Sequence, residues 1–277
     1  MHPSAYRLVP FPRFQRQMID WLELMHRKHA AYILVEVDVT KARHDIRAFR
    51  AETGRHLSLT TYITACFAHA LSENKLLHAY RKGRSRLALF DDVDVVVPVE
   101  REAEGQRIPM NVIVRAANTK SFEEIDQEIR AAKTGEHPQA GAEPWLPYWL
   151  LLPAFLRRFI WTRLMSNPYR RKRIMGTTIV TNAGMFGSGT GWGTFPSPYT
   201  CSVLVGSIAK KPAVVHEQVE VREYLCLTVS VDHDIVDGAV AARFVQQLKD
   251  LIEGTSLLDE VRGQDPAVHA GIGSVSG

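Results

Sequence analysis

The sequence contains few cysteines, and they lie far apart. Only three occur among the 277 residues, at Cys66, Cys201 and Cys226. This odd number without close spacing does not fit a disulfide framework, and the cysteines and histidines show no spacing typical of metal ligands. The neighbours in TACFA and YLCLTV are apolar, which predicts buried and reduced thiols.

An apolar leader and a strong charge excess are also missing. The N-terminal residues MHPSAYRLVPFPRFQ lack the apolar core of a signal peptide, so we expect a cytoplasmic protein. The formal net charge is only +4, and the basic residues are dispersed except for RRKR at residues 170–173. We interpret that cluster as a solvated loop, and nucleic acid as a poor candidate for the main partner.

No apolar run is long enough to span a membrane. The longest, PWLPYWLLLPAFLRRFIW at residues 144–161, contains three prolines, and its apolar stretch ends at Leu156. We expect a helix buried in a subunit interface or against the core. Two alternatives stay open: a wall of an acceptor channel, and a membrane-surface anchor. The anchor is suggested by Trp145, Trp149 and Trp161, which precede RRKR in the chain.

What is present fits one folded domain. Hydrophobic residues make up 45% of the chain and charged residues 23%, and neither a linker nor an internal repeat divides it. Strand-like patterns occur at residues 32–39, 174–181 and 224–231, and helical patterns at residues 40–53, 58–79 and 238–253. We expect a single α/β domain with a mixed sheet over residues 1–260, followed by a loose Gly/Ser-rich tail over residues 261–277.

The segment VDHDIVDG, residues 231–238, carries candidate chemistry. It places His233 at the end of a strand, Asp237 four residues later and Gly238 at the start of a helix. An imidazole in such a position can move protons near neutral pH. A short motif of this kind also occurs by chance, and then the histidine simply caps a turn.

The pattern His233-x-x-x-Asp237-Gly238 resembles the signature of the catalytic domain of dihydrolipoamide acyltransferases from 2-oxoacid dehydrogenase complexes. Chloramphenicol acetyltransferases share that fold. The order of other segments, such as VDVVVPVE at residues 93–100, is also similar over roughly residues 6–260. The resemblance implies a two-layer fold and a CoA-dependent acyltransferase. Only an atypical apolar insertion, at about residues 140–173, has no counterpart.

TIVTNAGMFG, residues 178–187, resembles a second segment of that family, in which a Ser or Thr hydroxyl donates to the oxyanion of the tetrahedral intermediate. Thr181 falls on the hydroxyl position, and Asn182 is expected to shape the turn. The resemblance implies that His233 is the general base and Thr181 the oxyanion donor, without an acyl-enzyme. The alternative is a threonine that satisfies backbone groups in a Gly-rich turn.

The resemblance gives Asp237 a mainly structural role, in which it holds the turn through an ion pair with Arg13 or Arg16. Gly238 is expected to allow a tight turn into the final helix, because a side chain would be crowded there. The family usually has Arg after the histidine, whereas this chain has Asp234. With Asp232 on the other side, negative charge favours the imidazolium and handicaps a base, unless Asp234 pairs with a cation elsewhere.

The implied partners follow from the same resemblance. We expect acyl-CoA as donor, a thiol, hydroxyl or amine as acceptor, and no metal; no residue is assigned to CoA. The sequence shows no lipoyl module, so we expect either a lipoyl group carried by another chain or a small-molecule acyl acceptor. A homotrimer is implied, with His233 of one subunit facing Thr181 of its neighbour, and a larger cage stays open. The competing hypothesis is a catalytically inactive scaffold or core subunit.

Overall fold

The computed structural model describes residues 7–11, 19, 22–23, 28–55, 57–103, 106–134, 152–183 and 190–255. Several predictions lie outside these ranges: the tail at residues 261–277, the first part of the insertion up to residue 151 with Trp145 and Trp149, and the ion-pair candidates Arg13 and Arg16.

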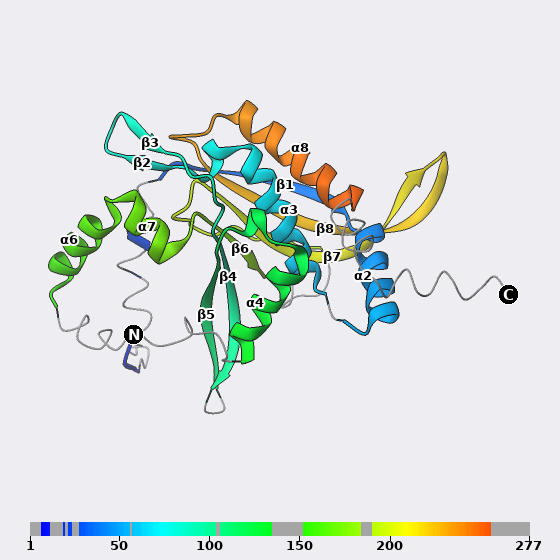
Figure 1. The fold of residues 1–277 in the computed structure, drawn as a ribbon, viewed down its shortest axis with the longest axis horizontal. Helices are drawn as coiled ribbons and strands as arrows, with labels where there is room; N and C mark the ends of the chain where they lie inside the picture. The colour runs from blue at the N-terminus through cyan, green and yellow to red at the C-terminus, as the bar shows by residue number, and fades with distance from the viewer. Residues whose placement is uncertain are drawn as a thin grey trace, which may run out of the picture.

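A six-stranded mixed sheet forms one layer of the molecule (Figure 1). Its strands, in order across the sheet, are β1 (Ala30–Asp38), β8 (Gln218–Asp232), β7 (Cys201–Val215), β6 (Thr178–Asn182), β4 (Val95–Ala103) and β5 (Gln106–Val114). The β6 strand runs parallel to both of its neighbours, and the other pairs are antiparallel. The predicted single α/β domain with a mixed sheet is therefore confirmed.

Helices form the second layer, on one face of the sheet (Figure 1). They are α2 (Thr40–Thr53), α3 (Leu59–Glu73), α4 (Phe122–Thr134) and α8 (Gly238–Gly254). The Ser58 hydroxyl begins α3 by accepting from the Thr61 amide at 3.0 Å, which satisfies one of the unpaired donors of the first turn. Phe67 and Phe244 join α3 to α8 edge to face, with ring centroids 6.0 Å apart, inside the buried core between the layers.

Short elements complete the fold. The strands β2 (Tyr80–Lys82) and β3 (Arg86–Ala88) form a separate hairpin, and the 3-10 helices are η1 (Lys75–His78) and η2 (Ala117–Thr119). The helices α6 (Ala154–Met165) and α7 (Pro168–Met175) lie beside the sheet (Figure 1). Met165 and Met175 pack with Val96 and Ile179, on the face opposite to the main core.

Two predictions about this region are wrong. RRKR is part of α7 rather than a loop, because Asn167 caps the helix and Pro168 occupies its first turn. The strand predicted at residues 174–181 begins only at Thr178, since α7 continues to Met175. The apolar helix α6 has no buried residue, so this part of the insertion does not lie within the core of its own chain. Among the described helices, none is long and apolar enough to cross a membrane.

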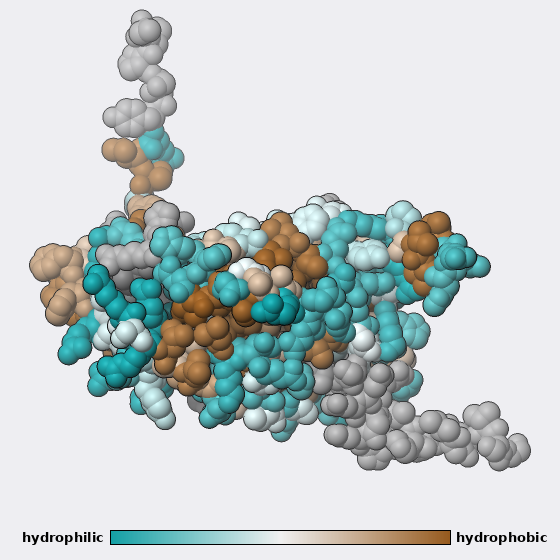
Figure 2. All heavy atoms as spheres, turned by 90° about the horizontal axis from the view of Figure 1, so that it is seen from above, coloured by the Kyte–Doolittle hydropathy of each residue, from teal (hydrophilic) through white to brown (hydrophobic). Residues whose placement is uncertain are grey.

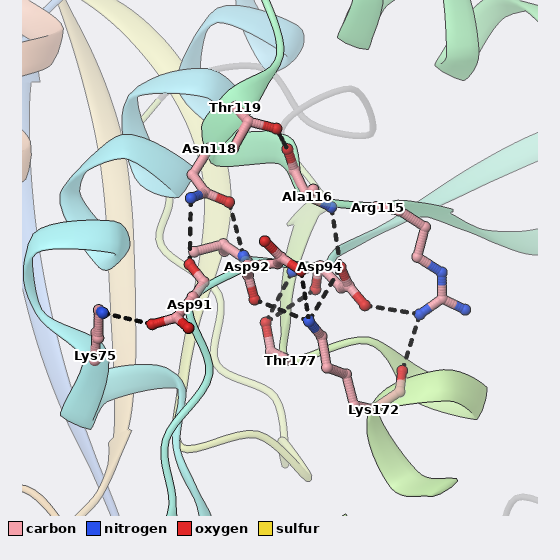
Figure 3. Close-up of polar contacts among 11 residues, drawn as sticks. Lys75, Asp91, Asp92, Asp94, Arg115, Ala116, Asn118, Thr119, Lys172 and Thr177 are labelled. Atoms are coloured by element: carbon pink, nitrogen blue, oxygen red, sulfur yellow. Dashed lines mark hydrogen bonds and ion pairs between the residues drawn. The ribbon is translucent and has the colours of Figure 1, made fainter. Parts of the chain in front are cut away.

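A polar network around Asp94 holds α7 and the start of β6 against the sheet (Figure 3). The buried Asp94 carboxylate accepts from the Ala116 amide at 3.0 Å and from Arg115 at 2.8 Å, and Lys172 of α7 lies 3.8 Å away. Its backbone exchanges hydrogen bonds with Thr177, 2.8 Å from the Thr177 amide to the Asp94 carbonyl. These contacts fix where β6 begins.

Gly176 joins α7 to β6 in a conformation that excludes other residues. Its φ is +69° and its ψ is −161°, a region that is essentially restricted to glycine. A Cβ atom there would lie 2.7 Å from the Asp94 carbonyl oxygen. We expect Gly176→Ala to lower the free energy of unfolding by about 3 kcal/mol or more.

Chemical denaturation of Gly176→Ala, compared with that of Gly54→Ala, separates the cost of the backbone conformation from the cost of the steric clash. Gly54 also has a φ of +70°, but an added Cβ atom would meet nothing within 4 Å. We therefore expect Gly54→Ala to cost only about 1 kcal/mol. Equal losses in the two variants would contradict the proposed clash.

Candidate active site

His233 lies in the turn that joins the central strand β8 to α8. Its backbone amide donates to the His29 carbonyl at 2.8 Å, and the amides of Ile235 and Val236 both donate to the Asp232 carbonyl at 3.0 Å. These bonds fix the turn at the end of the sheet. The His233 side chain is exposed to solvent, so the ring is accessible to an incoming molecule.

The two carboxylates that flank His233 are both paired with cations. Asp232 is buried and lies 2.8 Å from the Lys28 ammonium. Asp234 accepts from His29 Nδ1 at 2.7 Å and lies 3.3 Å from Arg81 on β2. The structure therefore shows the alternative in which Asp234 pairs with a cation elsewhere. The negative charge beside the imidazole is locally compensated.

Electrostatic effects in this cluster follow from those pairs. The hydrogen bond from His29 lowers the pKa of Asp234, and Arg81 adds to the effect, so this carboxyl stays ionised. Burial lowers the pKa of Lys28, although the neighbouring Asp232 carboxylate acts in the opposite direction. Sequence reasoning missed Lys28, His29 and Arg81, because no local pattern connects them to the histidine turn.

Asp237 caps the helix that follows the turn. Its carboxylate accepts from the Val240 amide at 2.9 Å, which satisfies one of the unpaired donors in the first turn of α8. The predicted partners Arg13 and Arg16 lie outside the described residues. The expected crowding at Gly238 is wrong for a single chain, because an added Cβ atom would meet nothing within 4 Å.

Thr181 lies on β6, two strands away from β8. Its neighbour Val180 points into the core beneath the helices, so the alternation of a strand directs Thr181 to the opposite face. The residue is half-buried there. Asn182 is the last residue of the strand, and its amide donates to the Thr60 hydroxyl of α3 at 2.8 Å. Asn182 thus ties the strand end to the helical layer rather than shaping a turn.

One chain does not bring His233 and Thr181 together. The ladders align Thr181 with Leu204 of β7, and Leu204 with Thr228 of β8. His233 follows Thr228 by five residues along β8, which at ~3.3 Å per residue and ~4.8 Å per strand separates the two positions by roughly 20 Å. His233 follows the end of β8, whereas Thr181 aligns with a position well inside the sheet.

Other candidate groups contribute little to a site. The three cysteines are buried and free, and burial raises the pKa of Cys66 to about 12, which makes this thiol unreactive. In the ranges that the structure describes, no cluster of His, Cys, Asp and Glu is arranged to hold a metal ion. Two surface hollows on the helical layer, one beside Arg243 and Asp250 and one beside Leu57 and Arg130, include neither His233 nor Thr181.

The sequence matches a known family of proteins over most of its length. The family model of the 2-oxoacid dehydrogenases acyltransferase (catalytic domain) matches residues 3–139 and 162–258. The chain therefore belongs to this acyltransferase family. Residues 140–161, which include the first two thirds of α6, lie between the two matched parts.

Curated relatives agree with this assignment. The chain is 26% identical over 264 residues to the dihydrolipoyllysine-residue acetyltransferase component of the pyruvate dehydrogenase complex of Rickettsia conorii, covering 93% of this chain and 56% of that protein. It is 25% identical over 228 residues to the lipoamide acyltransferase component of the branched-chain alpha-keto acid dehydrogenase complex of Bacillus subtilis, covering 80% of this chain and 46% of that protein. The chain thus spans about half the length of these relatives.

Solved structures show the same fold. A probable dihydrolipoamide acetyltransferase from Listeria monocytogenes superimposes with a TM-score of 0.67 at 23% identity, covering 92% of this chain and 97% of that one. The cubic core of a pyruvate dehydrogenase multienzyme complex gives a TM-score of 0.65 at 16% identity, covering 92% and 94%. At these identities the likeness extends to the fold alone.

Proposed function

We propose that the protein transfers an acyl group between CoA and an acceptor nucleophile, with His233 as general base and Thr181 as oxyanion donor. The observation that carries the proposal is the exposed His233 at the end of β8, in a chain that belongs to the acyltransferase family. The paired carboxylates beside it remove the main electrostatic objection to a base at this position.

The proposed step needs no covalent enzyme intermediate. His233 accepts the proton of the acceptor as its thiol, hydroxyl or amine attacks the thioester carbonyl carbon. The Thr181 hydroxyl donates a hydrogen bond to the oxyanion that forms. When the tetrahedral intermediate collapses, the carbon–sulfur bond breaks, and the CoA thiolate takes up the proton from the imidazolium. The products are free CoA and the acylated acceptor.

The proposed site contains residues of two protomers. A separation of roughly 20 Å along and across the sheet is too large for one substrate carbonyl to reach both side chains of the same chain. We infer a ring of three protomers in which His233 of one copy meets Thr181 of the next. A solved relative of the same fold forms a cubic core, which is compatible with a larger assembly of such rings.

A dihydrolipoyl thiol is the acceptor that we favour. The Rickettsia and Bacillus relatives are components of 2-oxoacid dehydrogenase complexes whose names specify a dihydrolipoyllysine or lipoamide group. We propose that this group is presented by another polypeptide segment or chain and enters opposite to CoA. A hydroxyl or amine acceptor would use the same proton transfer.

Mixing two inactive variants tests the shared site. When His233→Ala and Thr181→Ala chains assemble together at random in equal amounts, about one quarter of the sites should recover activity. In these sites the intact histidine comes from a Thr181→Ala chain and the intact threonine from a His233→Ala chain. The measurement is the release of free CoA thiol from a panel of acyl-CoAs with dihydrolipoamide as acceptor. Each variant assembled alone is the control.

The outcome separates the competing hypotheses. Recovery in the mixture supports the cross-protomer site. An active wild type with no recovery in mixed assemblies of native size would contradict the shared site while leaving the family activity intact. Absence of CoA release by the wild-type protein across acyl-CoAs and thiol, hydroxyl and amine acceptors would favour the inactive scaffold.

A further inference from the structure

The segment around α6 and α7 carries cations only. Between Pro144 and His216 the sequence contains no Asp or Glu, but it contains nine Lys and Arg residues. Seven of these lie within the two helices, at Arg157, Arg158, Arg163, Arg170, Arg171, Lys172 and Arg173. The protein as a whole has a net charge of only +4, so positive charge is concentrated in this region.

The outer side of α6 combines aromatic rings with arginines. Phe155 and Phe159, one helical turn apart, are 74% and 67% exposed. Arg158 lies three residues after Phe155, and Arg163 four residues after Phe159, so the two arginines flank the ring pair. Arg158 is paired with the Glu23 carboxylate, and Arg163 is exposed. Figure 2 shows hydrophobic atoms at the end of the molecule where α6 lies in Figure 1. We call this surface, together with the outer side of α7, the α6–α7 face.

The inner side of both helices is attached to the body, since Met165 at the end of α6 packs against the buried cluster that includes Tyr80 and Met175. Arg171 lies over the Tyr80 ring, with its guanidinium carbon 3.9 Å from the ring centroid, and Lys172 lies 3.8 Å from the Asp94 carboxylate. Arg170 and Arg173 are exposed, and so is Tyr169, at 84%. The outward residues are therefore presented by a helix that is already fixed, which reduces the entropy lost when a partner binds.

We infer that the α6–α7 face docks onto the surface of an anionic phospholipid membrane. Phenylalanine rings can enter the boundary between headgroups and acyl chains, while arginines pair with the lipid phosphates around them. The exposed cations Arg163, Arg170 and Arg173 complement such a surface. The inference is independent of the proposed acyl transfer.

Other occupants fit this face less well. Nucleic acid would use the cations and stack bases on the rings, but the exposed aliphatic side chains of Ile160 and Ile174 offer it nothing. A second copy of this chain would need a matching acidic patch opposite the exposed Arg163, Arg170 and Arg173. Lipid accounts for the aromatic, aliphatic and cationic components together.

Flotation of the full-length protein with vesicles tests this inference. We expect the protein to float with vesicles of phosphatidylcholine mixed with phosphatidylglycerol, not with pure phosphatidylcholine, and to be released by high salt. The double variant Phe155→Ala/Phe159→Ala should lose about 10-fold or more in binding. Arg163→Gln/Arg170→Gln, at two exposed arginines of this face, should lose a similar factor, with the remaining binding less sensitive to salt.

Val219→Ala/Val221→Ala is the matched control, because both valines are exposed on the projecting β7–β8 hairpin. This control should bind as the wild type does, and all variants should keep the wild-type melting temperature. Failure of the wild type to float with anionic vesicles would overturn the inference. Binding of single-stranded RNA without vesicle binding would do so as well, as would a change of oligomeric state in the Phe variant while flotation stays unchanged.

Discussion

We expect the His233→Ala variant to transfer acyl groups roughly 10²–10⁴-fold more slowly than the wild type, because a positioned general base contributes a factor of that size. The loss should appear in kcat, since the ring removes a proton during attack rather than holding the ground-state substrate. Release of CoA thiol, followed at saturating acyl-CoA, measures it.

His44→Ala provides the matched control for this prediction. His44 is another exposed histidine, on α2 beside Asp45, 3.2 Å away, and we expect its replacement to leave the rate unchanged. Because His233 makes its described hydrogen bond through the backbone, His233→Ala should keep the fold, as circular dichroism can verify. Wild-type turnover in a folded His233→Ala protein would exclude the general-base role.

The Thr181→Ala variant should lose roughly 10²–10³-fold in kcat, the usual effect of removing one oxyanion donor. KM for acyl-CoA should change little, because the hydrogen bond strengthens only as the carbonyl oxygen becomes negative. Steady-state kinetics with varied acyl-CoA separates the two parameters.

Two further substitutions at the same position distinguish chemistry from packing. Thr181→Ser retains the hydroxyl and should retain most of the activity, whereas Thr181→Val retains the shape and should resemble Thr181→Ala. Thr134→Ala, at the exposed end of α4, controls for the loss of a threonine elsewhere. Full activity of Thr181→Val would show that the hydroxyl is not used.

Local features of the fold could be predicted from the sequence. The apolar spacing predicts a helix over residues 238–253, and the structure has it at Gly238–Gly254, because such spacing is a local signal. The RRKR segment shows the limit of composition. Four consecutive cations suggest a solvated loop, but Asn167 and Pro168 just before them begin a helix, and Lys172 pairs with the buried Asp94.

For the candidate site, the sequence could predict which residues take part but not where they lie relative to each other. Thr181 and His233 could be selected from the sequence, but their separation depends on the register of β6, β7 and β8, which no local pattern specifies. The ion pair between Arg81 and Asp234 joins residues 153 positions apart in the chain. Such contacts depend on tertiary structure. The sequence alone therefore could not show whether the negative charge beside His233 is compensated.

The separation of His233 and Thr181 within one chain has a consequence for mixed populations of chains. In a closed ring of any size, every copy would contribute to two pockets, one on each side. A copy that lacks both His233 and Thr181 would then inactivate both of the pockets to which it contributes. The total activity would fall with the square of the fraction of intact chains. A minority of defective chains would therefore also lower the activity of the intact majority.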